Sequence, residues 1–366
     1  MSKGAKIIIS GGGTGGHIYP AVAIANELKA KDPGIEILFV GAEGKMEMEK
    51  VPKAGYKIIG LPIAGFNRSN MLANLGLPFK LLRSLWKTYQ IIKDFKPDAA
   101  IGVGGYASGP TLIMANFLNV PTLIQEQNSF AGVTNKNLAK KARKICVAYP
   151  GMERFFPKEK IVLTGNPVRK DILETASKRQ QALAHFKLND DRKVLLIIGG
   201  SQGARTINES ILAGLNDLIS NDLQIIWQTG KLFIDKARAA VDALQTSRVY
   251  VSDFIYEMDL AYAAADLVVS RAGALSVSEL CLTAKPSILV PFPAAAEDHQ
   301  THNALNLVNA NAAWCVKDAE AREKLVDQVI ALADDPKTMN ELSRNIKTLG
   351  KPNAGQEIAE EVLALI

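Results

Sequence analysis

The residues with the clearest chemical potential lie in a glycine-rich segment near the N-terminus, Lys6–Pro20, which reads KIIISGGGTGGHIYP. The apolar run Ile7–Ser10 predicts a buried strand, and five glycines predict a sharp turn before a helix that we expect to begin near Pro20 or Ala21. Glycines let the backbone approach a ligand closely, and the N–H groups of the following helix attract negative charge. His17 adds an ionisable group. The segment therefore predicts a site for a phosphorylated or sugar-bearing ligand.

Several other apolar runs are also followed by glycines or polar residues. Val194–Ile198 leads into the glycines of Gly199–Gly203, and a helix is expected over Arg205–Leu218. In parallel sheets, ligands bind at the carboxyl ends of the strands. A repeat of the pattern about half a chain away predicts two similar α/β units and favours an enzyme. Further segments of this kind are Gly102–Pro110, Gln125–Asn128, Ser270–Glu279 and Glu297–Asn303.

The first glycine segment is also compatible with a dinucleotide site. Gly11, Gly13 and Gly16 satisfy G-x-G-x-x-G, and Glu43 is roughly placed to hold a ribose. The additional glycines and the embedded histidine fit that interpretation poorly. A nicotinamide site would also leave the second glycine loop unexplained.

Three other chemistries are less well supported. Gly199–Gly203 matches the G-x-S-x-G nucleophile elbow, but only Asp298 with His299 or His302 could complete a triad. The two histidines lack further ligands for a metal. Neither a G-x-x-x-x-G-K-[ST] motif nor a D-x-D pair is present. Any pyrophosphate must then be neutralised by helix ends and a basic side chain, for which Arg169 is the nearest candidate.

Apolar runs of strand length alternate with amphipathic, helix-length stretches, which predicts parallel sheets with helices on both faces. The predicted strands are Ile7–Ser10, Ile35–Val40, Ile58–Leu61, Ala99–Val103, Thr122–Gln125, Ile145–Ala148, Ile161–Leu163, Val194–Ile198, Ile225–Gln228, Val249–Val251, Leu267–Ser270, Ser287–Val290 and Ala313–Val316. The predicted first-half helices are Ala21–Ala30, Phe79–Phe95, Gly109–Leu118 and Ala131–Lys140. We expect domains at 1–165 and 166–350, joined at Gly165–Pro167, with a last helix in 351–366 packing back on the first domain.

Composition indicates a globular protein. The chain has 366 residues, of which 48% are hydrophobic and 22% charged, so about two domains are expected. Cys146, Cys281 and Cys315 are scattered, which is typical of reduced thiols in the cytosol. We expect neither a secretory signal nor a membrane-spanning segment, because no apolar run reaches about 20 residues.

Positive charge is concentrated in the first half of a chain with net charge +6 and pI about 9.0. One basic cluster lies in Asn135–Lys144 and another in Asn67–Lys96. Solvated helix faces, an anionic membrane surface and nucleic acid would each account for such clusters. Nucleic acid is disfavoured, because no binding module or interleaved aromatic set accompanies the charge.

Taken together, the motifs resemble the family of bacterial N-acetylglucosaminyltransferases that complete lipid II, the lipid-linked peptidoglycan precursor. GGTGGHIYPA, GVGGYASGP, QEQN, GNPVR, GGSQGA, RAGALSVSE and EDHQTHNA occur in the family's order. The resemblance implies the α/β GT-B fold, with two Rossmann-like, doubly wound parallel-sheet domains facing across a cleft. It also implies inverting transfer of N-acetylglucosamine from UDP-N-acetylglucosamine to the C4 hydroxyl of undecaprenyl-pyrophosphoryl-N-acetylmuramoyl-pentapeptide (lipid I).

By this resemblance the donor site lies mostly in the second half. Ser201 and Arg169 would hold the diphosphate, Ile255 would meet the uracil through its backbone, Glu279 would bind the ribose hydroxyls and Gln300 would read the sugar. The helix start around the diphosphate and ribose would comprise Ala274, Leu275, Ser276, Val277, Ser278 and Glu279. Residues reaching the sugar from the first domain would be Thr14, Gly15, Gly16 and Asn128.

The same resemblance places the acceptor and the chemistry in the first half. His17 has the pKa range of a general base, and Glu126 competes for that role. The acceptor-facing residues would be Gly13, Gly104, Gly105, Tyr106 and Ser108. Two departures from the family stand out: Gln125 replaces a histidine found in some members, and His299 replaces a glutamine.

The implied enzyme requires no cofactor. A divalent cation is compatible with it but not implied, and no metal site is expected. The implied partners are the donor, lipid I, the anionic surface of the cytoplasmic face of the inner membrane and other cell-wall synthesis proteins. Leu72, Leu75, Leu77, Phe79, Leu82 and Trp86, interspersed with Lys80, Arg83 and Lys87, would rest on the lipid. The alternatives are a UDP-N-acetylglucosamine epimerase on the same fold and a non-catalytic nucleotide-binding module.

Overall fold

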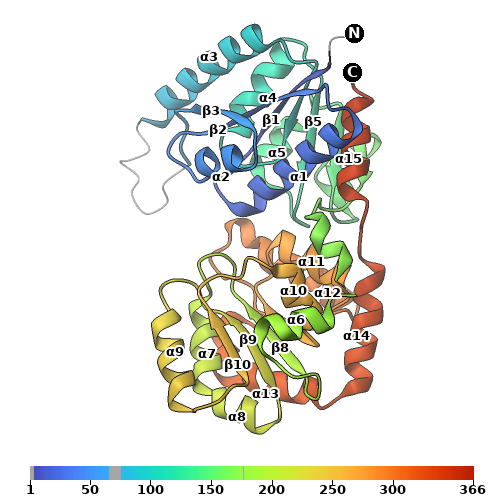
Figure 1. Ribbon diagram of the computed structural model, residues 1–366. Helices are drawn as coiled ribbons and strands as arrows, with labels where there is room; N and C mark the ends of the chain where they lie inside the picture. Colours follow the sequence, from blue (N-terminus) through green and yellow to red (C-terminus); the bar gives the residue numbers. More distant parts are fainter. Residues whose placement is uncertain (1–3, 66–75, 176) are drawn as a thin grey trace. The chain divides into compact units, whose positions relative to one another are not determined.

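The computed structural model describes residues 4–65, 76–175 and 177–366, in two units that each contain one parallel sheet (Figure 1). The first unit comprises the described residues up to Val168 together with Pro352–Ile366, and the second comprises Arg169–Lys351. The chain therefore returns to its first unit at the C-terminus.

The seven-stranded sheet of the first unit has the order β3-β2-β1-β4-β5-β6-β7. Its strands are β1 (Lys6–Ser10), β2 (Glu36–Ala42), β3 (Lys57–Leu61), β4 (Ala99–Gly102), β5 (Thr122–Glu126), β6 (Lys144–Val147) and β7 (Ile161–Leu163). The chain begins in the middle, runs to one edge and restarts at β4 on the other side of β1. The carboxyl ends of β1 and β4 therefore form a topological switch point, where open parallel sheets bind ligands.

Helices cover both faces of this sheet. Ile7 and Ile9 pack in a core with residues of α1 and α15, whereas Ile8 packs in a core with residues of α3 and α4. Burial on both faces explains why β1 reads as an unbroken apolar run. The helices are α1 (Gly15–Lys31), α2 (Glu47–Lys53), α3 (Leu77–Phe95), α4 (Ser108–Phe117), α5 (Val133–Leu138) and α15 (Ala354–Leu363). Helices α1 and α15 lie side by side (Figure 1).

The six-stranded sheet of the second unit repeats the same strand order, β10-β9-β8-β11-β12-β13. Its strands are β8 (Val194–Ile198), β9 (Gln224–Gln228), β10 (Val249–Ser252), β11 (Leu267–Ser270), β12 (Ser287–Leu289) and β13 (Trp314–Cys315). The helices are α6 (Arg179–Phe186), α7 (Arg205–Ala213), α8 (Leu215–Ser220), α9 (Ile234–Ala243), α10 (Met258–Ala264), α11 (Ala274–Thr283), α12 (His299–Asn309), α13 (Ala321–Ala333) and α14 (Pro336–Thr348). Here the switch point lies between β8 and β11.

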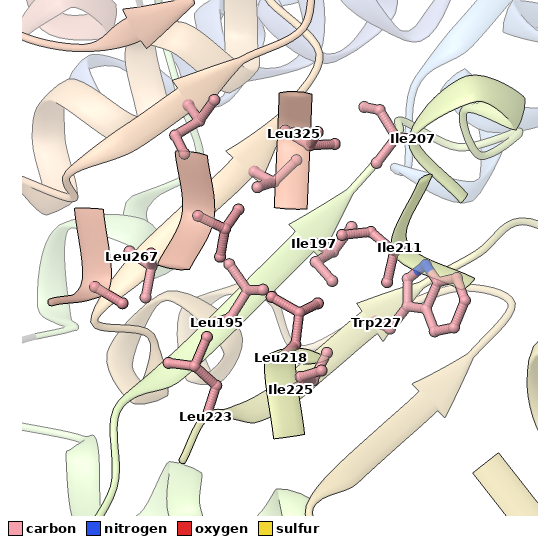
Figure 2. Packing of buried hydrophobic residues seen from close by; sticks show 14 of the residues in the cluster. Leu195, Ile197, Ile207, Ile211, Leu218, Leu223, Ile225, Trp227, Leu267 and Leu325 are labelled. Atoms are coloured by element: carbon pink, nitrogen blue, oxygen red, sulfur yellow. The ribbon is translucent and has the colours of Figure 1, made fainter. Parts of the chain in front are cut away.

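A tightly packed core fixes the central strands of the second unit. Figure 2 shows Leu195 and Ile197 of β8 packed among side chains of the neighbouring strands and helices. Trp227 of β9 is fully buried, and its indole nitrogen donates to the Asn208 side-chain oxygen at 3.0 Å. Buried side chains of this size each contribute about 1.5–3 kcal/mol. The core thus holds rigidly the strands whose ends carry the glycine loops.

The predicted sheets are confirmed, and every predicted strand overlaps an observed one. Helix boundaries were less accurate. Helix α1 begins at Gly15 instead of Pro20 or Ala21, because the glycines adopt helical geometry and Pro20 is accommodated inside the helix. The single helix expected over Arg205–Leu218 is divided at Gly214 into α7 and α8. The short helices α2, α9 and α10 were not predicted.

Candidate active site

The two glycine loops of the first unit meet at the switch point between β1 and β4. A Cβ on Gly105 would collide with the carbonyl oxygen of Gly12, and a Cβ on Gly11 would collide with the Val103 side chain. Gly105 also has φ +86°, which side chains rarely tolerate. The segments after β1 and β4, predicted separately as ligand-binding, are therefore in direct contact.

His17 lies in the first turn of α1, directly over this junction. Its Nδ1 is 3.0 Å from the carbonyl oxygen of Gly12. Because a carbonyl can only accept, this contact favours a proton on Nδ1, and a neutral ring would then have its lone pair on Nε2. A Cβ on Gly104 would lie 2.8 Å from Nε2, so the second loop packs against the imidazole. The fold thus places an imidazole at the carboxyl ends of β1 and β4.

Thr14, Gly15 and Gly16 form the amino end of α1, with Thr14 as an exposed N-cap residue. Their backbone N–H groups lie where a helix attracts negative charge. The N–H of Gly13 has a different partner, since it donates to Glu47 Oε2 at 2.9 Å. Sequence reasoning missed Glu47. Its only signal was a carboxylate shortly after a predicted strand.

The other predicted acceptor residues differ in accessibility. Tyr106 is half-exposed and its ring lies against Gly65. Ser108 is fully buried, with its hydroxyl packed toward Gly102. The hydroxyl of Ser108, at the start of α4, therefore does not face solvent.

Glu126 organises the loop that follows β5. It is 2% exposed, and its carboxylate accepts from the N–H groups of Asn128 (3.0 Å) and Gly132 (3.1 Å) and from the Asn135 amide (2.8 Å). Burial raises the pKa of Glu126, and these hydrogen bonds oppose that rise. Because Glu126 is buried and both its oxygens already accept hydrogen bonds, the geometry favours a structural role for it over that of a general base. Asn128 is held beside it.

Gln125 precedes Glu126 in β5 and is part of a buried hydrogen-bond network. Its amide nitrogen donates to the Asn166 side-chain oxygen at 3.0 Å, and Asn166 donates to the carbonyl of Gln127 at 3.0 Å. Gln127 donates in turn to the Val103 carbonyl at 2.6 Å. The Gln125 amide therefore fixes Asn166, in the predicted linker segment, to the first unit.

In the second unit, the loops after β8, β9 and β10 are in backbone contact at their carboxyl ends. A Cβ on Gly203 would collide with the Thr229 carbonyl, and the Gly230 N–H donates to the Asp253 carbonyl at 3.1 Å. Ser201 is exposed in the first of these loops. Ile255 is 3% exposed, so its side chain is packed in the interior.

Helix α11 begins at Ala274, where the predicted diphosphate-binding segment starts. Val277 is buried in the core, and the Ser278 hydroxyl donates to the Ala274 carbonyl at 3.0 Å. Leu275 and Ser276 are partly exposed. The amino end of this helix therefore offers a ligand mainly backbone N–H groups and small side chains.

Glu279 is partly buried one turn further along α11. Its Oε2 accepts from the Tyr262 hydroxyl at 3.0 Å. Burial raises the pKa of Glu279, and the nearby positive charge of Arg169 opposes this. Arg169 also forms a 3.8 Å ion pair with Asp171. Arg169 and Glu279, both predicted donor ligands, thus lie within electrostatic range of one another.

Gln300 links two strand ends. Its side-chain oxygen accepts from the N–H groups of Ala272 (3.1 Å) and Phe292 (3.0 Å), which leaves the amide N–H₂ as the side that can donate to a sugar. Just before it, Glu297 and Asp298 have φ of 52° and 54°. Left-handed backbone in two consecutive non-glycine residues is strained, and such strain clusters at functional sites.

Arg271 is a further residue whose role was not predicted. It is buried, and its guanidinium donates to the carbonyls of Val290 (3.0 Å) and Pro291 (3.2 Å) and pairs with Asp318. It joins the ends of β11 and β12 and so fixes the loop that leads into α11. Glu43, the alternative ribose ligand, instead pairs with Lys87 at 2.9 Å.

Among residues 4–65, 76–175 and 177–366, no group of three His, Cys, Asp or Glu residues could hold a metal ion. Within the same ranges no helix combines the length and apolar character needed to cross a bilayer.

The doubly wound sheets and the glycine loops at their strand ends define an α/β protein with ligand-binding loops, and two family matches identify it as a glycosyltransferase. Residues 7–147 match the glycosyltransferase family 28 N-terminal domain, and residues 194–358 match the family 28 C-terminal domain. This family accounts for both halves of the chain, which neither the dinucleotide nor the hydrolase interpretation did.

Relatives narrow the family further. A protein of Phocaeicola vulgatus named UDP-N-acetylglucosamine--N-acetylmuramyl-(pentapeptide) pyrophosphoryl-undecaprenol N-acetylglucosamine transferase is 58% identical over all of this chain and 97% of its own. Its namesake in Bacteroides fragilis is 57% identical over 98% of this chain and 95% of its own. The crystal structure of Acinetobacter baumannii MurG is 30% identical, with TM-score 0.81, over 98% of this chain and 99% of that one. The chain belongs to this family of transferases.

Proposed function

We propose that this protein transfers N-acetylglucosamine from UDP-N-acetylglucosamine to the C4 hydroxyl of lipid I, forming lipid II. The main support for this proposal is that transferases of this name are 57–58% identical to the chain over nearly its whole length. An epimerase on the same fold and a non-catalytic binding module have no comparable support.

In the proposed reaction, His17 Nε2 takes the proton of the C4 hydroxyl as its oxygen attacks the anomeric carbon. The bond from that carbon to UDP breaks, and the anomeric centre inverts. Negative charge grows on the leaving diphosphate, where the α11 amino end and Arg169 stabilise it. Glu279, oriented by Tyr262, accepts from the ribose hydroxyls.

The decisive experiment is product analysis after incubation with UDP-N-acetylglucosamine and lipid I. We expect the lipid-linked disaccharide and free UDP. Conversion of the donor to its C2 epimer without acceptor would indicate the epimerase, and binding without turnover would indicate the binding module. In His17→Ala, kcat should fall by roughly 10²–10⁴, the usual contribution of a general base, while the donor Kd is retained. Wild-type turnover in that variant would remove His17 from the mechanism.

We further propose that the protein works at the anionic cytoplasmic face of the inner membrane, where lipid I and other cell-wall enzymes would meet it. On α3, Phe79 is 76% and Trp86 63% exposed, and Leu82 is also exposed. Lys80 and Arg83 alternate with them. Leu72 and Leu75, predicted to belong to the same surface, lie outside the described residues. An apolar stripe edged with cations is typical of a helix at a lipid surface.

Vesicle sedimentation tests the membrane proposal. Wild-type protein should sediment with anionic vesicles more than with neutral ones, and a Phe79→Ser/Trp86→Ser variant should sediment less. Leu232→Ser is the control, because Leu232 is 97% exposed in the second unit, away from α3 in the sequence. Equal sedimentation of all three proteins would contradict the proposal.

A further inference from the structure

Glu47 is a buried carboxylate with two backbone partners and no role in the proposed reaction so far. It is the first residue of α2 and is 1% exposed. Oε2 accepts from the Gly13 N–H at 2.9 Å, and Oε1 accepts from the Ala42 N–H at 3.0 Å. Glu47 therefore ties the glycine loop after β1 to the end of β2.

The peptide group between Gly12 and Gly13 connects this carboxylate to His17. Its N–H donates to Glu47, and its C=O accepts from His17 Nδ1 at 3.0 Å. In a trans peptide the two groups point in opposite directions, so the peptide lies between the carboxylate and the imidazole. A hydrogen bond to an anion is strong and polarises the amide, which makes its carbonyl a better acceptor.

The surrounding backbone is shaped to this carboxylate. A Cβ on Gly12 would collide with the Glu47 carboxylate, and a Cβ on Gly41 would lie 2.6 Å from Glu47 Cγ. Both carboxylate oxygens are used. A glutamine has nearly the same shape but only one acceptor atom, so it cannot serve both N–H groups.

We propose that Glu47 is a positioning residue for glycosyl transfer. Through the Gly12–Gly13 peptide it holds His17 with the proton on Nδ1 and the lone pair on Nε2, and it stabilises the imidazolium that forms when Nε2 takes the acceptor proton. This inference rests on the proposed function with His17 as general base. Glu47 would thus place a negative charge beside His17, although its own side chain touches neither substrate.

The test compares Glu47→Gln, His17→Ala and the double variant with wild type. Glu27→Gln is the matched control, because Glu27 is a buried carboxylate in the same helix as His17 but near Gly355 of α15. For Glu47→Gln we expect kcat to fall about tenfold to 100-fold, as a misplaced catalytic group can cost about 10², with the KM for UDP-N-acetylglucosamine within about twofold of wild type. Glu27→Gln should turn over like wild type.

Two readouts separate positioning from a merely structural role. The ¹⁵N resonances of the His17 ring should report a neutral Nδ1–H tautomer in wild type and a loss of that preference in Glu47→Gln. The double variant should be no slower than His17→Ala. Multiplicative losses, wild-type kcat in Glu47→Gln or unchanged His17 resonances would each overturn the inference.

The wild-type tautomer tests the inference even where Glu47→Gln does not fold, because an Nε2–H ring would contradict it. Failure of the proposed function looks different. In that case neither wild type nor Glu27→Gln forms the disaccharide.

Discussion

The contact between the loops after β8 and β9 can be tested with two glycines of the same loop. Gly200 and Gly203 have φ of +80° and +75°. A Cβ on Gly203 would collide with the Thr229 carbonyl, whereas a Cβ on Gly200 would meet nothing within 4 Å. Alanine at either position suffers the same backbone strain, and only at Gly203 does it also displace the neighbouring strand end.

The strain of a left-handed alanine costs about 1–2 kcal/mol, and forced overpacking typically adds about 1–3 kcal/mol. We therefore expect Gly200→Ala to lower the free energy of unfolding by about 1–2 kcal/mol, and Gly203→Ala by about 2–5 kcal/mol. In a domain of this size each kcal/mol lowers Tm by about 2–4 °C. UDP affinity should also fall further in Gly203→Ala, because Ser201 moves with the loop.

The assay is thermal unfolding with and without UDP, accompanied by UDP titration calorimetry. Gly200→Ala serves as the internal control for stability, since it introduces the same backbone strain without the collision. Equal Tm shifts and equal UDP affinities in the two variants would refute the reasoning that these strand ends are locked by backbone contact.

Two further predictions concern ionisable groups of the second unit. Tyr262→Phe removes the hydrogen bond to Glu279. Hydrogen bonds to charged groups contribute about 1.5–3 kcal/mol, so UDP binding should weaken by roughly tenfold in calorimetry. Glu279→Ala should weaken it more, because the ribose ligand itself is lost, and Tyr262→Phe should then cause no further loss; additive losses would show that the pair does not act together. Burial lowers the pKa of Lys285 to about 8, against the opposing attraction of Asp266. The unfolded chain then binds more protons than the folded one between about pH 8 and 10.5, so wild-type stability should rise with pH in this window relative to Lys285→Met in urea unfolding. A constant difference between the two proteins would contradict that pKa.

The strands and their parallel arrangement were predictable because they depend on local pattern. Runs such as Ile7–Ile9 and Val194–Ile198 are apolar at every position, which is typical of strands buried on both faces. The glycine segments could be identified as ligand-binding for a similar reason, since a backbone approached by a ligand or by another loop excludes Cβ atoms. Local pattern did not fix where α1 begins, because two glycines carry little helix propensity of their own.

The partners of the polar side chains could not be predicted. Glu47 and Ala42 are close in sequence, but Gly13 is 34 residues from Glu47, and nothing in the local pattern pairs them. Arg271 and Asp318, which form an ion pair, are likewise 47 residues apart in the sequence. Glu126 illustrates the opposite problem, because a carboxylate at a strand end is equally compatible with catalysis and with anchoring a loop, and only its hydrogen bonds distinguish them.

By itself, the sequence determined two doubly wound units, the glycine loops at their strand ends and, through motifs in order, the transferase family. Only the tertiary structure decided which loops meet, which proton His17 carries and which carboxylates are committed to the backbone. The physical reason is that strand formation and close backbone approach depend on side-chain size and polarity along a few residues. A hydrogen bond between distant residues depends instead on the strand order, which brings β1 between β2 and β4.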